Sequence, residues 1–147
     1  MTGTTYPPSG VTPLSAHEVR AALLALNRPD ARFVVRQGTA KERADLVAEC
    51  DVAAWALILK TRMRLDAPAR EVRVLEERWE PVSEGSGRQY GRGPARTIYR
   101  KWEFKRGVDG RRRRVETLRF DTREMKDPLQ KAVLGAGWTW RGVLFRF

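Results

Sequence analysis

The sequence has few of the residues that bind metals or form covalent cross-links. Its 147 residues include a single cysteine, Cys50, and a single histidine, His17. One cysteine excludes an intrachain disulfide, and the carboxylates left as metal ligands lack the spacing of a calcium loop. Glu49 and Asp51 flank Cys50 and are expected to raise the pKa of its thiol, which disfavours a nucleophile. We therefore predict no metal, no cofactor and no catalytic residue, which favours a protein that is not an enzyme.

Long apolar runs are also absent from the sequence. No stretch approaches the roughly 20 apolar residues of a transmembrane helix, and residues 1–10 lack the basic flank and apolar run of a secretory signal. We expect a cytoplasmic protein that does not contact membranes. The length fits one domain. The Thr, Gly, Pro and Ser content of residues 1–13 predicts a disordered leader before a single domain at 14–147.

Acidic residues are scarce in the second part of the chain. The formal net charge is +11, yet residues 1–87 hold 12 basic and 12 acidic side chains. Residues 88–147 hold 17 basic and 6 acidic ones, and within them residues 88–114 hold 11 and 2. A general preference for arginine (23 Arg against 6 Lys) does not by itself segregate charge along a chain. The segregation therefore indicates an anionic partner.

Apolar periodicity separates helical from extended segments in the first third of the chain. Ser15 and Glu18 have the spacing of a capping box, and the apolar residues that follow at helical intervals predict a helix over 15–27. Residues 39–59 are ambiguous, because their alanine content favours a helix. Their apolar and acidic residues alternate with period two, which favours a strand over 45–53 and leaves a helix as the alternative.

A second helix is expected near the end of the chain. Asp127 is placed to cap it, and Pro128 fits its first turn, so the helix is predicted over 128–135. Gly137 supplies the positive φ that ends such a helix. The apolar, β-prone residues 138–147 predict a terminal strand.

Turn residues mark further strands and complete the predicted fold class. We expect a strand at 32–37 and two hairpins, which are 57–65 with 71–79 and 97–106 with 111–120. The fold is therefore predicted as α+β, with a curved, mainly antiparallel sheet of about six or seven strands. The sheet could close into a barrel around the second helix, by analogy with tubby-like folds.

Charge pairing favours one register for the second hairpin. A two-residue turn at 109–110 would place like charges directly opposite each other, which is unfavourable. A four-residue loop at 107–110 instead places Glu103 opposite Arg114. We therefore expect the four-residue loop. In either register the basic residues crowd together at the tip.

Two basic segments are candidates for binding nucleic acid or another polyanion. The Gly-rich segment 83–94 is predicted to be a mobile loop in which arginines and a tyrosine could follow a phosphate backbone. The tip of the second hairpin could enter a groove or lie along a backbone, whereas Trp102 is expected in the core. The predicted polyanion-binding residues are Arg88, Arg92, Arg96, Lys105, Arg106, Arg111, Arg112, Arg113 and Arg114, with Tyr90 and Tyr99 as aromatic contacts.

Two other functions are weighed against polyanion binding. A small-ligand or protein-interaction scaffold would use an aromatic pocket formed by Trp55, Trp138 and Trp140. A carboxylate-based enzyme would need two acids that converge in a cleft. Its candidates are two clusters, Asp45, Glu49 and Asp51 in the first, and Glu76, Glu77 and Glu80 in the second.

Four short segments resemble small uncharacterised proteins of GC-rich bacteria. They are Phe-Asp-Thr at 120–122, Lys-Asp-Pro-Leu at 126–129, Gly-Ala-Gly-Trp-Thr-Trp-Arg at 135–141 and Asp-Leu-Val-Ala-Glu at 45–49. The resemblance implies no activity and no functional residues. It does favour the strand over the helix at 45–53.

Overall fold

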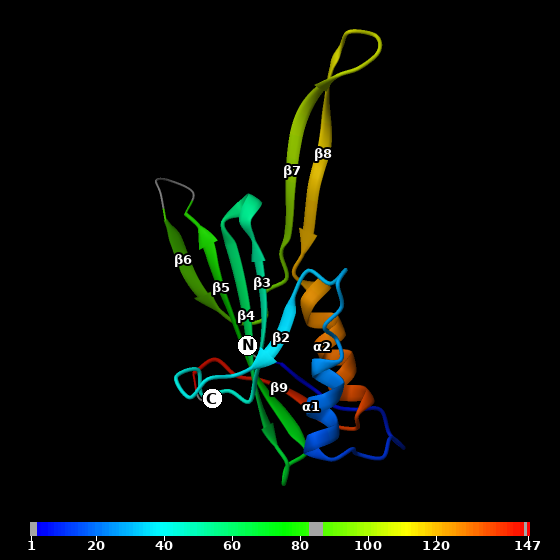
Figure 1. Ribbon diagram of the computed structural model, residues 1–147, viewed down its shortest axis with the longest axis vertical. Coiled ribbons are helices and arrows are strands. Elements are labelled where there is room, and N and C mark those ends of the chain that lie inside the picture. The colour runs from blue at the N-terminus through cyan, green and yellow to red at the C-terminus, as the bar shows by residue number, and fades with distance from the viewer. Residues whose placement is uncertain (1–2, 83–86, 146) are drawn as a thin grey trace.

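The computed structural model, which describes residues 3–82, 87–145 and 147, is an α+β fold (Figure 1). Its helices are α1 (Ala16–Leu24) and α2 (Arg123–Gly135). Seven strands form the main sheet: β1 (Thr4–Thr5), β2 (Val34–Gln37), β3 (Leu46–Val52), β4 (Leu57–Asp66), β5 (Glu71–Pro81), β6 (Arg88–Arg92) and β9 (Thr139–Gly142). A separate ribbon consists of β7 (Ile98–Arg106) and β8 (Arg112–Asp121).

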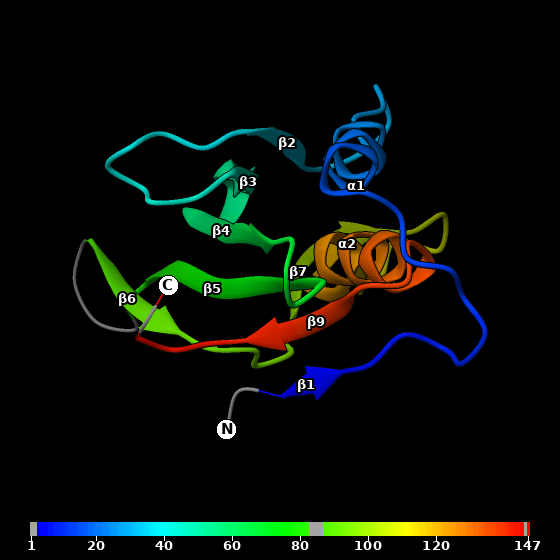
Figure 2. The same cartoon turned by 90° about the horizontal axis from the view of Figure 1, so that it is seen from below.

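The main sheet is open and curves around α2 (Figure 2). Its strand order is β1-β9-β5-β4-β3-β2, and β6 is a further neighbour of β5. The first part of β5 pairs in parallel with β9, and its last part pairs antiparallel with β6. The sheet is therefore mainly antiparallel with the predicted number of strands, and it does not close into the barrel that was considered.

The core lies between the sheet and the two helices. Alternation along β3 and β4 turns one set of side chains toward the helices, because successive residues of a strand face opposite ways. The helices contribute one face each, including Val19 and Leu23 from α1 and Leu129 and Val133 from α2, all of them 0% exposed. No helix in the described part of the chain is long and apolar enough to cross a membrane.

Both predicted helices are present, but their observed ends differ from the predicted ones. Ser15 caps α1 as expected, since its Oγ accepts from the Glu18 backbone N–H at 3.2 Å and donates to the Glu18 carboxylate at 3.0 Å. Helix α2 begins at Arg123, five residues before the predicted start, so Pro128 lies inside it. Pro128 has no backbone N–H, so α2 lacks the hydrogen bond that this residue would otherwise donate to the carbonyl four residues earlier.

The start of α2 has its own capping signal at Asp121, six residues upstream of the predicted cap at Asp127. The Asp121 Oδ1 accepts from the Arg123 backbone N–H at 3.0 Å, and the Glu124 Oε2 accepts from the Asp121 backbone N–H at 2.9 Å. This reciprocal pattern satisfies donors that a helix start leaves unpaired.

The strand prediction over 45–53 and the first hairpin are confirmed. Residues 46–52 form β3, so the helix considered for 39–59 is wrong there. Strands β4 and β5 pair as a hairpin, with Asp66 opposite Glu71. The terminal strand is shorter than predicted, because β9 covers only Thr139–Gly142.

The described part of the predicted disordered leader has a defined course instead. Thr4 and Thr5 pair with β9, and the Leu14 backbone N–H donates to the Ala136 carbonyl at 2.9 Å. A Cβ at Gly137, which has φ +76°, would come within 2.8 Å of the Pro13 Cα. The composition of residues 1–13 favours disorder when it is considered alone. It does not reveal that β9 has a free edge with which Thr4 and Thr5 can pair.

The Gly-rich segment also differs from its prediction. Residues 83–86 lie outside the described residues, and residues 88–92 form β6 rather than a loop. Tyr90 lies opposite Trp79, with ring centroids 5.1 Å apart. Backbone hydrogen bonds to the last part of β5 hold β6 as a strand. The Gly-rich composition of this segment gives no indication of that partner.

Candidate nucleic-acid interface

Strands β7 and β8 form a ribbon that projects beyond the main sheet (Figure 1). Hydrogen bonds fix its base to the domain. The Arg78 guanidinium donates to the Thr97 Oγ1 at 2.8 Å, to the Tyr99 Oη at 3.3 Å and to the Ala95 carbonyl. The Thr122 backbone N–H donates to the Thr97 carbonyl at 3.0 Å. These contacts give the ribbon a defined direction.

Apolar packing continues this anchor into the core. Phe120 is 0% exposed, and its cross-strand neighbour Tyr99 packs against Trp55 with ring centroids 5.9 Å apart. Arg32 donates to the Arg119 carbonyl at 2.7 Å. The base of the ribbon is therefore part of the domain core, whereas the residues beyond Lys101 are exposed.

The register of the ribbon differs from both turns considered. Arg106 lies opposite Arg112 and Lys105 opposite Arg113, so the loop has five residues, 107–111. The expected four-residue loop is wrong. A register shift lies between Lys101 and Trp102. On the base side of this shift, the residues pair as they would with a two-residue turn at 109–110, so that Lys101 lies opposite Leu118. On the tip side the pairing is offset by one residue, and like charges lie opposite each other.

One side of the outer ribbon combines aromatic rings with arginines. Residues two apart on a strand share a face, as do residues directly opposite each other. The register therefore places six side chains together on what we call the tip face: Trp102, Phe104, Arg106, Arg112, Arg114 and Glu116, the last of which lies directly opposite Trp102. The Arg114 Cζ lies 4.5 Å from the Trp102 ring centroid, and the Arg112 Cζ lies 5.6 Å from that of Phe104.

The cations of the tip have few acidic neighbours. Arg113 pairs with Asp109 at 3.0 Å, with both side chains largely in solvent. Among the described residues, no ion pair involves Lys105, Arg106, Arg111, Arg112 or Arg114. Like charges directly opposite each other destabilise a strand pair. The outer ribbon therefore carries an excess of positive charge, because residues 102–117 hold six basic and three acidic side chains.

The other predicted polyanion-binding residues are separated from the tip. Arg88 and Arg92 lie on β6, which pairs with β5 in the main sheet and does not belong to the ribbon. Arg92 donates to the Tyr90 Oη at 2.6 Å and to the Leu144 carbonyl at 2.9 Å. Arg96 pairs with Asp121 at the ribbon base at 2.7 Å. The structure thus brings together the hairpin residues but not the arginines of the Gly-rich segment.

The two predicted aromatic contacts also lie away from the tip face. Tyr90 is on β6, where its hydroxyl donates to Glu77; burial and this hydrogen bond raise the pKa of Tyr90. Tyr99 is half-buried at the ribbon base. Sequence reasoning missed Trp102 and Phe104, which are 40% and 65% exposed, and it was wrong to expect Trp102 in the core. The signal was their spacing of two residues within an arginine-rich hairpin.

The three tryptophans of the alternative pocket belong to the core or its border. Trp138 and Trp140 are 1% and 2% exposed, and the Trp138 Nε1 donates to the Leu14 carbonyl at 2.8 Å. Trp55 is half-buried beside Tyr99. Trp138 and Trp140 are too deeply buried to present ring surface to a ligand, whereas part of the Trp55 side chain is exposed.

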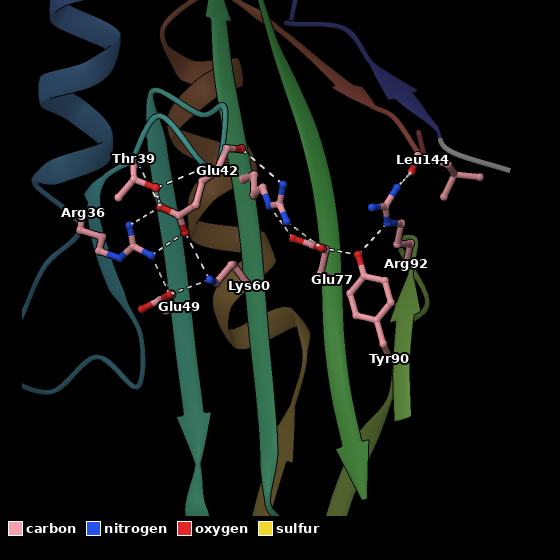
Figure 3. Close-up of polar contacts among 10 residues, drawn as sticks. Arg36, Thr39, Glu42, Glu49, Lys60, Glu77, Tyr90, Arg92 and Leu144 are labelled. Carbon is pink, nitrogen blue, oxygen red and sulfur yellow. Dashed lines mark hydrogen bonds and ion pairs between the residues drawn. The ribbon is translucent and has the colours of Figure 1, made fainter. Parts of the chain in front are cut away.

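The acidic residues of the sheet are held by cations rather than paired with each other (Figure 3). Glu49 accepts from Arg36 at 2.8 Å and lies 3.3 Å from Lys60, and these cations lower its pKa. Glu77 pairs with Arg62 at 2.6 Å on the outer face of β5. Because the lowered pKa keeps Glu49 charged, this carboxylate is poorly suited to general acid catalysis.

Neighbouring acids of the sheet also face different ways. Glu76 faces the helices, where burial raises its pKa and Lys126 lies 3.4 Å away beside a cavity of about 200 Å³. Glu77 faces the other side of β5.

Burial is the main cause that raises the pKa of the Cys50 thiol to about 11. In the described part of the chain, no three His, Cys, Asp or Glu side chains lie together as metal ligands would.

No protein-family model, curated protein or solved structure matches the chain. In its described residues the chain is an α+β domain with an open, curved sheet from which the β7–β8 ribbon projects.

Proposed function

We propose that the protein is a non-catalytic binding domain that engages nucleic acid or another polyanion through the outer part of the β7–β8 ribbon. The observation that carries this proposal is the group of exposed tip cations that face each other and, apart from Arg113, form no ion pair in the described structure. Arginine is suited to such contacts because its planar guanidinium can form two parallel hydrogen bonds with a phosphate. The cytoplasmic location expected from the sequence is compatible with this partner.

Binding of a labelled 20-nucleotide oligonucleotide, followed by fluorescence anisotropy at several salt concentrations, tests the proposal. We expect affinity to fall linearly with salt on a log–log plot, with a slope of about −0.7 to −0.9 for each phosphate neutralised. The triple variant Arg106→Gln, Arg112→Gln, Arg114→Gln should bind much more weakly and show a shallower slope, because these residues supply the phosphate contacts.

A matched control removes three charges elsewhere. Arg28, Lys41 and Lys131 are exposed and lie outside the ribbon, so their replacement by Gln lowers the net charge equally. This control should bind nearly as well as the natural protein. Absence of binding at low salt contradicts the proposal, and an equal loss in both triple variants contradicts the assignment to the ribbon.

A further inference from the structure

The tip face exposes two aromatic rings where a purely electrostatic surface would need none. Trp102 is 40% exposed and Phe104 is 65% exposed. Placing large apolar side chains in water gives up the stabilisation that their burial would supply. Phosphates do not compensate for this, because rings attract the flat faces of bases and cations rather than anions.

From this arrangement we propose that the ligand is a single-stranded nucleic acid, whose bases stack on Trp102 and Phe104. This inference rests on the proposed function and names the substrate class of the same surface. The two residues are on one strand and one face, so their side chains are roughly 7 Å apart at about 3.4 Å per residue. An extended single strand can place two successive bases at such a spacing.

The neighbouring arginines are arranged to hold the backbone of that strand. Arg114 and Arg112 lie against the two rings, at 4.5 and 5.6 Å from the ring centroids. A guanidinium that stacks on a ring still presents its N–H groups at its edge, where a phosphate can accept them. Arg106 extends the same face toward the turn. Bases and phosphates of one strand therefore find alternating partners along the tip face.

A duplex uses this face less well. Its bases are already stacked on each other, so the rings could reach a base face only after unstacking a step, which costs a few kcal/mol. A duplex offers the ribbon its phosphates and the edges of its bases. The exposed rings are thus the feature that favours the single strand over the duplex.

Three ligands distinguish the possibilities in one salt condition: a 20-nucleotide oligothymidylate, a duplex of the same length, and heparin, a polyanion without bases. The variants are Trp102→Leu and Phe104→Leu, which keep apolar volume and lose the ring. We expect each to weaken oligothymidylate binding roughly 5- to 100-fold and to leave heparin binding unchanged. The variant Phe104→Tyr, which keeps a ring, should bind oligothymidylate as the natural protein does. The variant Tyr6→Leu, which removes another exposed ring, should leave oligothymidylate binding unchanged.

A direct signal comes from tryptophan fluorescence. Stacking of thymine on Trp102 should quench part of the emission when oligothymidylate binds, and this quenching should be missing in Trp102→Leu. Equal affinity for single strand and duplex, with both leucine variants unaffected, overturns the single-strand inference and leaves the proposed function standing. The single-strand inference is also overturned, and the proposed function still stands, if heparin binds as tightly as oligothymidylate and the leucine variants bind both ligands normally. No binding of any of the three ligands overturns both.

Discussion

At the scale of single residues, Glu42 shows how the outer face of the sheet holds its charges. The carboxylate accepts two hydrogen bonds from Arg36, at 2.8 and 2.7 Å, and one from Lys60 at 3.2 Å (Figure 3). It also accepts from the Thr39 backbone N–H at 3.0 Å. The hydrogen bonds from Arg36 are the main cause that lowers the pKa of Glu42 well below its usual range.

This pKa shift predicts how stability depends on pH. A carboxyl group whose pKa is lowered by folding stabilises the protein above its unfolded pKa, about 4.3 for Glu, and the stabilisation is lost as pH falls through the folded pKa. We expect Glu42→Gln to lower the free energy of unfolding at pH 7 by about 1–2 kcal/mol. The difference from the natural protein should shrink as the pH falls below about 4. Urea unfolding at pH 7, 4 and 3 measures it.

The control for this prediction is Glu103→Gln on the exposed ribbon. No ion pair of Glu103 occurs in the described part of the chain, so this substitution should change stability little at any of these pH values. A Glu42→Gln deficit that stays constant from pH 7 to pH 3 would show that lost packing, and not the charge, causes the effect.

Residue types alone predicted part of the candidate site. The sequence places Arg106, Arg112 and Arg114 close together because a hairpin turn separates them by only a few residues. It could not show that Arg96 pairs with Asp121, since this contact depends on the tertiary position of the ribbon base. It also could not assign Trp102 to solvent, because an apolar residue at that spacing fits either face of a strand.

At the scale of elements, a largely buried side chain of the main sheet is one of the contacts that hold the ribbon base. Arg78, whose side chain is 13% exposed, comes from β5 and contacts the segment that leads into β7. Hydrogen bonds to charged groups contribute about 1.5–3 kcal/mol each. The direction of the ribbon, and hence the position of the tip face, is therefore set by a residue outside the basic segment.

We predict that Arg78→Leu loosens the ribbon base without unfolding the sheet. Amides at residues 98–101 and 118–121 should exchange with solvent about tenfold faster or more, because local opening becomes easier. Amides of β3 and β4 should exchange at nearly unchanged rates. Hydrogen exchange followed by mass spectrometry measures both. The matched variant is Arg73→Leu, at a more exposed arginine of the same strand. Equal effects of the two variants would contradict the assigned role of Arg78.

The sequence predicted the existence of most elements better than their ends. Strand β3 follows from alternation, which reflects one buried and one open face of the sheet, and the first hairpin follows from the turn residues between two β-prone segments. The start of α2 was misplaced because Asp127 and Pro128 form a plausible cap. In the competing pair, Asp121 is the last residue of β8 and Glu124 lies in the first turn of α2. Strands β1 and β6 were missed because short edge strands depend on a partner that their own residues do not indicate.

At the scale of the whole molecule, the question is whether net charge or local arrangement determines binding. The formal charge of +11 could attract a polyanion to many places on the surface. The structure divides this charge between a compensated domain face, where arginines and glutamates pair, and a ribbon where the tip cations face each other. If the local arrangement of side chains determines binding more than net charge does, the ribbon should be necessary for polyanion binding even though it holds a minor share of the net charge.

A shortened ribbon separates these two effects. Lys101 pairs with Leu118, so residues 102–117 can be replaced by Asn-Gly, which favours the tight turn of a two-residue hairpin. The deleted segment holds six basic and three acidic side chains, which lowers the formal charge only from +11 to +8. Tyr99 and Phe120 are retained, so we expect a free energy of unfolding within about 1 kcal/mol of the natural protein.

We predict that this shortened protein loses oligonucleotide binding at a salt concentration where the natural protein binds. The Arg28→Gln, Lys41→Gln, Lys131→Gln variant has the same formal charge of +8 and keeps the tip face, so it should retain binding. Anisotropy titrations of the two proteins, after thermal unfolding has shown that both are folded, give the comparison. Equal affinities would mean that the diffuse field of the domain is sufficient, since electrostatic attraction at long range depends on total charge. Loss in the shortened protein alone would locate the interaction on the ribbon.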